Sequence, residues 1–131
     1  MAAMTLSLNT AVQPLDLLIL LLLGHFVADY PLQGDKMAVE KCPGKDVTLS
    51  WRWWLSAHAG THGFFVAILT GIPVLGLAEM ACHFLIDFGK CRLGYRLIVD
   101  QALHWGCKLF WVLCVMTVSY THLTLPTIVR V

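Results

Sequence analysis

The chain has 131 residues, of which 58% are hydrophobic and 13% charged, and its mean hydropathy is +0.72. This balance is more apolar than that of soluble domains, and the length suits one domain. A net charge of +1 without a long basic block gives no basis for nucleic-acid binding. The composition predicts an integral membrane protein whose partner is the lipid bilayer.

The apolar segments predict an all-α fold, an up-down bundle of about four transmembrane helices. The first helix is expected over about residues 11–30, with Pro14 in its first turn and Pro31 ending it. Residues 33–50 form a polar connector, and Ser50 is the expected N-cap of the next helix. The second helix is expected over about residues 51–70, and a turn at 71–76 leads into the third, which ends near residue 90. The fourth helix is expected over about residues 97–117. An alternative treats 64–88 as one kinked span, but it would separate the polar pairs described below.

Five cysteines form no CxxC motif and mostly fall inside apolar segments, where cysteine behaves as a small hydrophobe. Their odd number argues against a disulfide scaffold. Cys91 follows Asp87 by four residues, so a thiolate ligand is the alternative. The cysteines are Cys42, Cys82, Cys91, Cys107 and Cys114.

Each apolar segment carries two ionisable residues four positions apart, a spacing that places both side chains on one helix face. The pairs are His25 with Asp29, His58 with His62, His83 with Asp87, and Asp100 with His104. In an up-down bundle all the pairs fall near the same end. Because ionisable groups are costly against hydrocarbon, we expect them to face the bundle interior.

Histidine and carboxylate at this spacing form a chelating edge, so the sequence predicts a divalent metal site. The mixed nitrogen and oxygen set favours Zn, Mn or Fe. Asp29, Asp87 and Glu79, which lies one turn before His83, are the candidate catalytic acids or bases. Alternatively, each pair joins helices by hydrogen bonds, or Lys108 neutralises a carboxylate without metal. The expected ligands are His25, Asp29, His58, His62, His83, Asp87, Asp100 and His104.

These residues lead to a hypothesis of a metal-dependent hydrolase acting on an amphipathic or lipid-linked substrate near the interface. The alternatives are a proton or divalent-metal transport component and a non-catalytic membrane anchor or interaction protein. The other half of the bundle offers little polar beyond Asp16 and Glu79, which favours a one-sided site over a conduit.

Basic residues gather at the end of the bundle that carries the pairs, and the loop at the opposite end has no charge. The positive-inside rule therefore predicts a multi-pass inner-membrane protein with loops 33–50 and 91–96 in the cytoplasm. The residues concerned are Lys36, Lys41, Lys45, Arg52, Lys90, Arg92 and Arg96.

Residues 118–127, with the sequence VSYTHLTLPT, resemble the in-frame translation of a sequencing adapter. We therefore expect a membrane domain at 1–117 followed by a non-native tail at 118–131, and we exclude His122 from the site.

Four motifs together resemble a small bacterial and phage membrane family known only as domain of unknown function thirty-three-zero-seven. They are GHFVADYPLQ at 24–33, HAGTH at 58–62, HFLIDFGK at 83–90 and DQALH at 100–104. The resemblance covers about residues 15–111 and implies a polytopic membrane fold without implying an activity. The adapter-like tail departs from the family.

Overall fold

The computed structural model describes residues 13–124, with side chains as far as residue 119. This part of the chain is helical and contains no strand, which confirms the predicted all-α class. Its helices are α1 (Pro14–Asp29), α2 (Asp35–Glu40), α3 (Trp51–Thr70), α4 (Pro73–Leu93) and α5 (Leu97–Thr124).

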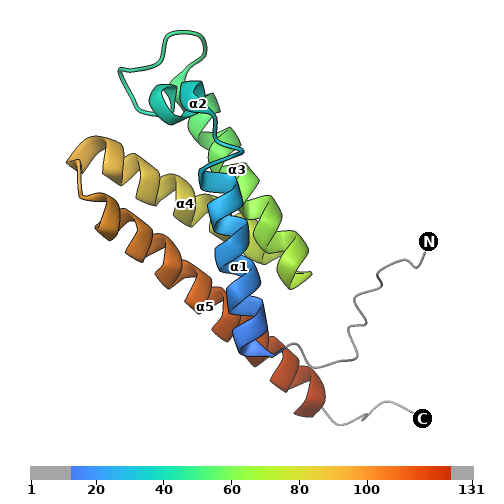
Figure 1. The fold of residues 1–131 in the computed structure, drawn as a ribbon. Helices are drawn as coiled ribbons and strands as arrows, with labels where there is room; N and C mark the ends of the chain where they lie inside the picture. The colour runs from blue at the N-terminus through green and yellow to red at the C-terminus, as the bar shows by residue number, and fades with distance from the viewer. Residues whose placement is uncertain (1–12, 125–131) are drawn as a thin grey trace.

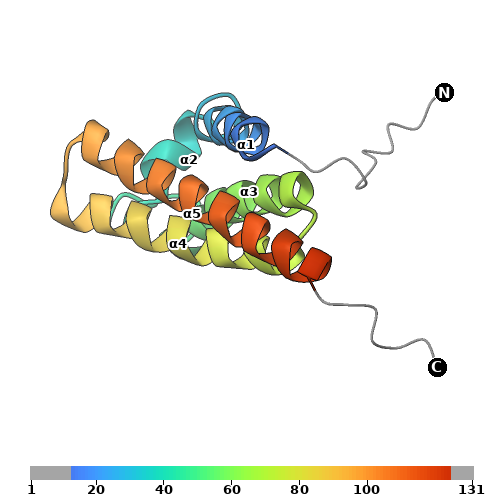
Figure 2. The same cartoon turned by 90° about the horizontal axis from the view of Figure 1, so that it is seen from below.

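The four long helices form an up-down bundle in which each packs against two others. Helix α3 contacts α1 and α4, and α5 contacts the same two helices from the other side. Figure 1 shows the short α2 at the end of the bundle where α1 ends and α3 begins, and Figure 2 shows the long helices from below. The end of α1, the start of α3, the end of α4 and the start of α5 therefore meet at one level.

Several helix ends follow the expected local signals. Pro14 lies in the first turn of α1, and the Ser50 side chain accepts a hydrogen bond of 3.4 Å from the Arg52 backbone N–H at the start of α3. Gly71 has a φ of 70°, which suits glycine, and it ends α3 just before Pro73 opens α4. The hairpin is thus confirmed over the single kinked span, while a start near residue 11 lies outside the described residues.

Other boundaries differ from the prediction. The connector contains α2, which six residues are too few to reveal by hydrophobic periodicity. Helix α4 continues to Leu93, and α5 continues past residue 117 to Thr124. The stretch set apart as a foreign tail therefore begins inside a helix rather than after one.

Glu40, at the end of α2, holds the connector against α3. Its Oε2 accepts hydrogen bonds from the Thr48 backbone N–H at 2.8 Å, the Val47 N–H at 3.0 Å, the Thr48 hydroxyl at 2.8 Å and the Trp54 indole at 3.1 Å. These donors, led by the Thr48 N–H, lower the pKa of the Glu40 carboxyl to about 2. The contacts join the end of α2 to the later part of the connector and to the start of α3.

Helices α3 and α4 approach closely at two glycines. A Cβ added to Gly63 would lie 2.5 Å from the Gly76 carbonyl oxygen, and one added to Gly76 would lie 2.6 Å from the Gly63 carbonyl oxygen. No side chain fits at either position without moving a helix backbone.

A disulfide joins Cys42 of the connector to Cys91 near the end of α4, with Cα atoms 5.4 Å apart. The sequence interpretation treated both as small hydrophobes, and for this pair it was wrong. Their contact depends on the fold of the connector, because 49 positions separate the two residues. Cys82, Cys107 and Cys114 are free.

The bundle buries polar side chains and exposes apolar ones. Buried polar residues include five histidines and Lys108, whereas Leu15, Phe64, Leu85 and many other large apolar side chains face outward. A smaller apolar core lies toward the opposite end, formed by Leu17, Leu21, Val66, Trp111, Val112 and Val115.

By length and hydropathy, one described helix could cross a membrane. It is α5, over Leu97–Ser119, with a mean hydropathy of 1.4. The predicted bundle of four transmembrane helices is not supported on these criteria. Helix α1 has only 16 residues, and the ionisable residues of α3 and α4 lower their hydropathy.

Candidate metal centre

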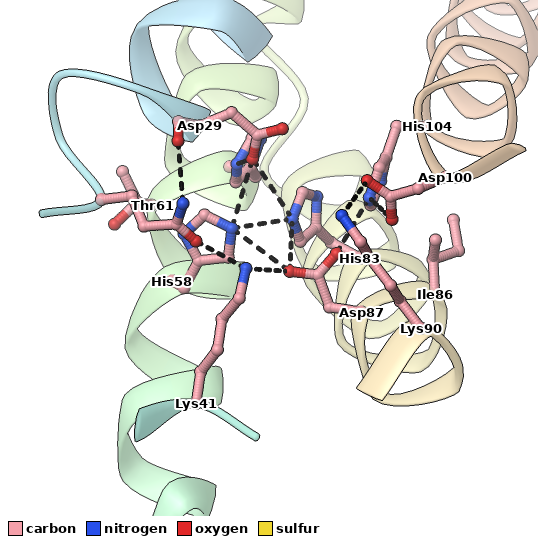
Figure 3. A network of polar contacts seen from close by, with 12 residues as sticks. Asp29, Lys41, His58, Thr61, His83, Ile86, Asp87, Lys90, Asp100 and His104 are labelled. Carbon is pink, nitrogen blue, oxygen red and sulfur yellow. Dashed lines mark hydrogen bonds and ion pairs between the residues drawn. The ribbon is translucent and has the colours of Figure 1, made fainter. Parts of the chain in front are cut away.

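All the residues of the four sequence pairs converge between the helices. Figure 3 shows side chains from α1, α3, α4 and α5 pointing toward one another. All are buried except Asp29, whose side chain is 12% exposed. Each imidazole directs its Nε2 atom toward a carboxylate of the cluster. The i, i+4 spacing thus places both members of every pair on the inner face.

One group of ligand atoms surrounds Asp29 of α1. Its Oδ1 lies 2.9 Å from His62 Nε2, 3.3 Å from His58 Nε2 and 4.0 Å from His83 Nε2. The His58 and His83 Nε2 atoms are 3.2 Å apart. Tetrahedral ligands about 2.0–2.2 Å from an ion lie about 3.3–3.6 Å from one another. The group therefore has the spacing of a metal site. The same distances also suit hydrogen bonds from imidazole N–H groups to the carboxylate, which is how the group is held without an ion.

A second group surrounds Asp87 of α4. Its Oδ1 lies 3.0 Å from His104 Nε2, while its Oδ2 lies 3.3 Å from His58 Nε2 and 3.5 Å from His83 Nε2. Asp100 Oδ1 is 3.4 Å from His104 Nε2 and has no hydrogen-bond partner among the described residues. Asp87 thus connects the His104 side of the cluster with the His58 side.

Gln101 links the helix-one pair to the rest, and sequence reasoning missed it. Its Oε1 lies 3.0 Å from His25 Nε2, and its amide N–H groups donate to Asp29 Oδ2 at 3.1 Å and Asp100 Oδ2 at 3.2 Å. His25 Nε2 is also 3.3 Å from Asp29 Oδ2. Gln101 was missed because its side chain is a neutral amide and the i, i+4 pattern consists of ionisable residues, although it is the second residue of the DQALH motif.

The far sides of the rings are sparsely partnered. The Nδ1 atoms of all five cluster histidines are buried without a hydrogen bond in the described part of the chain. The Nδ1 of His83 comes within 3.4 Å of Glu79 Oε1. Metal-binding histidines are commonly oriented by such a carboxylate on the other ring nitrogen.

Glu79 lies one turn from the cluster in its own buried charge pair. Lys108 Nζ is 2.5 Å from Glu79 Oε1, and the Trp111 indole donates to Glu79 Oε2 at 2.5 Å. Glu79 and Lys108 are each 1% exposed. The carboxylate that Lys108 neutralises is therefore Glu79, rather than a member of the four pairs.

Two lysines contact the cluster from the connector side (Figure 3). Lys41 Nζ lies 2.7 Å from Asp87 Oδ2 and 2.5 Å from Gln33 Oε1, and Lys90 Nζ lies 3.3 Å from Asp100 Oδ2. A cavity of about 130 Å³ beside them is lined by three aspartates of the cluster. Lys41 was missed because a lysine in a charged connector looks like any solvated residue.

A neighbouring cavity of about 420 Å³ shares Gln33, Lys41, Asp87 and Lys90 with the first. A separate groove of about 200 Å³ between α3 and α4 is lined by apolar residues and glycines and includes no cluster residue. Access to the cluster is therefore from the connector end.

Comparison with known proteins gives the family and no activity. No curated protein and no solved structure matches the chain significantly. The family match takes in part of the stretch 118–131, whose foreign origin stays a prediction. The chain belongs to the family described as protein of unknown function (DUF3307), whose model matches residues 17–129.

Proposed function

We propose that the cluster binds one or two divalent metal ions and hydrolyses an amphipathic or lipid-linked substrate. The observation that carries the proposal is the convergence of four imidazole Nε2 atoms, those of His58, His62, His83 and His104, on Asp29 and Asp87 at metal-ligand spacing. His25 and Asp100 lie beside these two groups and outside them. Among the described residues, Asp29, Asp87 and Asp100 bring three negative charges, and Lys41 and Lys90 bring two positive ones. A divalent cation suits the remaining negative charge and the desolvated nitrogen ligands.

The shape of the cluster bears on the number of ions. His83 Nε2 belongs to both ligand groups, but this single atom can bind only one ion. The two oxygens of Asp87 face different groups, one toward His104 and the other toward His58. Asp87 would therefore be a candidate ligand shared by the two groups. The nitrogen and oxygen set favours Zn, Mn or Fe, and no thiolate is required.

The aspartates and Glu79 differ in what they can do. A bound metal supplies hydroxide near neutral pH and polarises the bond under attack. Asp29 and Asp87 line the cavity beside the cluster, so either can contact substrate or accept a proton. Glu79 lines neither cavity and is held by Lys108, so we assign it the positioning of His83 through Nδ1 rather than proton transfer.

We also propose that the four long helices lie in a bilayer, as a polytopic bundle. The support is the inverted distribution of polarity, because a soluble bundle would expose its charged residues and bury its leucines. Helices α3 and α4 fall short in hydropathy because they carry the inward-facing ligands. Helix α1 would span about 24 Å, compared with about 30 Å of hydrocarbon, so it would need local thinning or flanking turns.

The site is proposed to face the cytoplasm, with loops 33–50 and 91–96 on that side of the inner membrane. The basic residues of those loops support this orientation. The Cys42–Cys91 disulfide opposes it, because such bonds persist in oxidising compartments. Because basic residues occur in both loops and the opposite loop has none, we infer that the pair is a dithiol in the cell and that the structure shows its oxidised form.

A one-sided site is favoured over a conduit for protons or metals. Beyond Glu79 and Lys108 the interior continues as an apolar cluster that includes Leu21, Val66 and Trp111. A pathway would need polar groups or water through that region.

The proposed membrane domain ends at residue 117, with 118–131 foreign to it. Truncation after residue 117 should leave membrane insertion and metal content unchanged. Loss of inserted protein would show that the last turns of α5 belong to the fold.

Metal analysis of detergent-purified protein tests the proposed function. After loading with Zn, Mn or Fe, we expect one or two ions per wild-type chain, and stoichiometric loss in His58→Ala and Asp87→Asn. Glu40→Gln is the matched control, because it also neutralises a buried carboxylate but lies outside the cluster. Wild-type protein that retains no stoichiometric metal under any of these conditions would overturn the proposal.

A further inference from the structure

The larger cavity at the connector end is lined by three lysines. It has a volume of about 420 Å³, within the range of about 300–1,000 Å³ usual for small-molecule sites. Lys41 and Lys45 enter it from the connector, and Lys90 enters it from α4. Asp87 lines the same cavity, so the basic pocket and the candidate metal ligands share one wall.

We propose that this cavity binds a phosphoryl group, so that the substrate is a phosphate ester or a diphosphate. This inference rests on the proposed function and names its substrate class. Several lysines around one cavity suit a group with more than one negative charge, which an acyl ester or amide does not carry.

The lysines differ in how they are occupied. Lys41 contacts Asp87, and a metal held by Asp87 would compete with the lysine for that carboxylate and favour contact between Lys41 and an anion. Lys90 contacts Asp100 at 3.3 Å, and its side chain is 39% exposed, so it can also face a ligand in the cavity. Lys45 has no hydrogen-bond or ion-pair partner for its side chain among the described residues. It can therefore contact a ligand without breaking a contact within the protein.

The position of the cavity suits hydrolysis at the metal centre. A phosphoryl group beside Lys41 lies next to Asp87, which faces His58 and His104 (Figure 3). In the reaction, the oxygen of one water bonds to phosphorus and the bond from phosphorus to the leaving oxygen breaks. One proton of that water passes through a cluster carboxylate to the leaving oxygen, and inorganic phosphate or a phosphomonoester departs.

Calorimetric titration of metal-loaded protein with inorganic phosphate and with inorganic diphosphate tests anion binding. Lys45→Met should weaken binding about tenfold, the factor that corresponds to about 1.4 kcal/mol. Lys45→Arg should keep the affinity within about threefold, because it keeps the charge. Lys36→Met is the matched control, since it removes an exposed lysine of α2 outside the cavity and should leave affinity unchanged.

Metal content is measured on the same samples, which separates the two proposals. Absence of metal overturns the proposed function. The phosphoryl site is overturned if the protein has its full metal content but binds neither phosphate nor diphosphate. It is also overturned if Lys45→Met and Lys36→Met bind these anions with equal affinity.

Phosphate release then distinguishes the source of the group. Phosphatidic acid in mixed micelles represents a lipid substrate, and glycerol phosphate represents a soluble one. Release from either, with a KM raised in Lys45→Met but not in Lys36→Met, supports the inference and identifies the source. Release from neither by protein that binds metal and diphosphate would overturn the assignment of a phosphoester substrate.

Discussion

Replacing Lys108 with methionine should destabilise the bundle severely. Lys108 and Glu79 are each 1% exposed, and their charged atoms are 2.5 Å apart. Methionine keeps most of the side-chain volume but leaves the Glu79 carboxylate buried without a counter-charge. Removing one partner of a buried pair costs about 3–5 kcal/mol.

A second route sets a ceiling on this loss. The folded variant can take up a proton on the orphaned carboxyl instead of burying its charge. For an ordinary glutamate, with a pKa of about 4.3, protonation costs about 3.7 kcal/mol at pH 7 and about 1.6 kcal/mol at pH 5.5. We therefore expect a deficit of about 3–4 kcal/mol at pH 7 that shrinks by about half or more at pH 5.5.

Equilibrium unfolding in mixed micelles at both pH values measures the effect. Lys36→Met, at an exposed position, should change the free energy of unfolding by less than about 0.5 kcal/mol. The double variant Glu79→Gln/Lys108→Met removes both charges and should recover much of the loss. A loss in Lys108→Met no larger than in Lys36→Met, or one independent of pH, would refute the buried pair.

Three other predictions concern the packing, the connector and the cysteines. Gly63→Ala should cost about 1–3 kcal/mol because its Cβ would lie 2.5 Å from a backbone oxygen of α4, whereas Gly106→Ala, with nothing within 4 Å, should be neutral or slightly stabilising. Equal unfolding free energies for the two would contradict the close approach. Because the pKa of Glu40 falls from 4.5 to about 2 on folding, its contribution should be fully present above pH 4.5 and lost as the pH falls toward 2. Denaturant unfolding curves of wild type and Glu40→Gln, followed by tryptophan fluorescence at pH 2 to 6, should give unfolding free energies that converge only near pH 2. Equal unfolding free energies at every pH would contradict the carboxylate's role. When cells are quenched with acid and their proteins are then labelled with a maleimide at neutral pH, Cys42 and Cys91 should react as free thiols. Labelling of the two cysteines only after reduction would place the loops in an oxidising compartment.

The sequence was sufficient to predict that the members of the four i, i+4 pairs lie close together. Each pair repeats at i, i+4, and a short hairpin brings pairs near helix ends to one level, so local periodicity and connectivity were enough. His83 and Asp87, for example, are separated from Asp100 and His104 by a single tight turn. The interior position followed from the cost of these groups against lipid.

The remaining features depend on contacts that no periodic pattern encodes. Glu40, Lys41 and Gln101 acquire partners as far as 14, 46 and 76 positions away, and the disulfide spans 49. These residues occupy a charged connector or stand beside a more conspicuous aspartate. The partners of Glu40 and Lys41 depend on how the connector folds back over α3, and those of Gln101 depend on the packing of α5 against α1. The sequence alone did not specify either arrangement.

The disagreement over membrane spans has a physical source within the site itself. Hydropathy counts every residue of a helix, whereas lipid contacts only the outer face. In α4, Glu79, His83 and Asp87 are buried while Leu77 and Leu85 are 68% exposed, so the polar residues that lower its score never meet the surroundings. Helix α5 passes the test because its residues from Leu109 to Ser119 are mostly apolar and include no acidic or basic side chain. If the bundle lies in lipid, the helices that supply most ligands are the ones that a hydropathy scan is least able to recognise, and the polarity of each face is the better criterion.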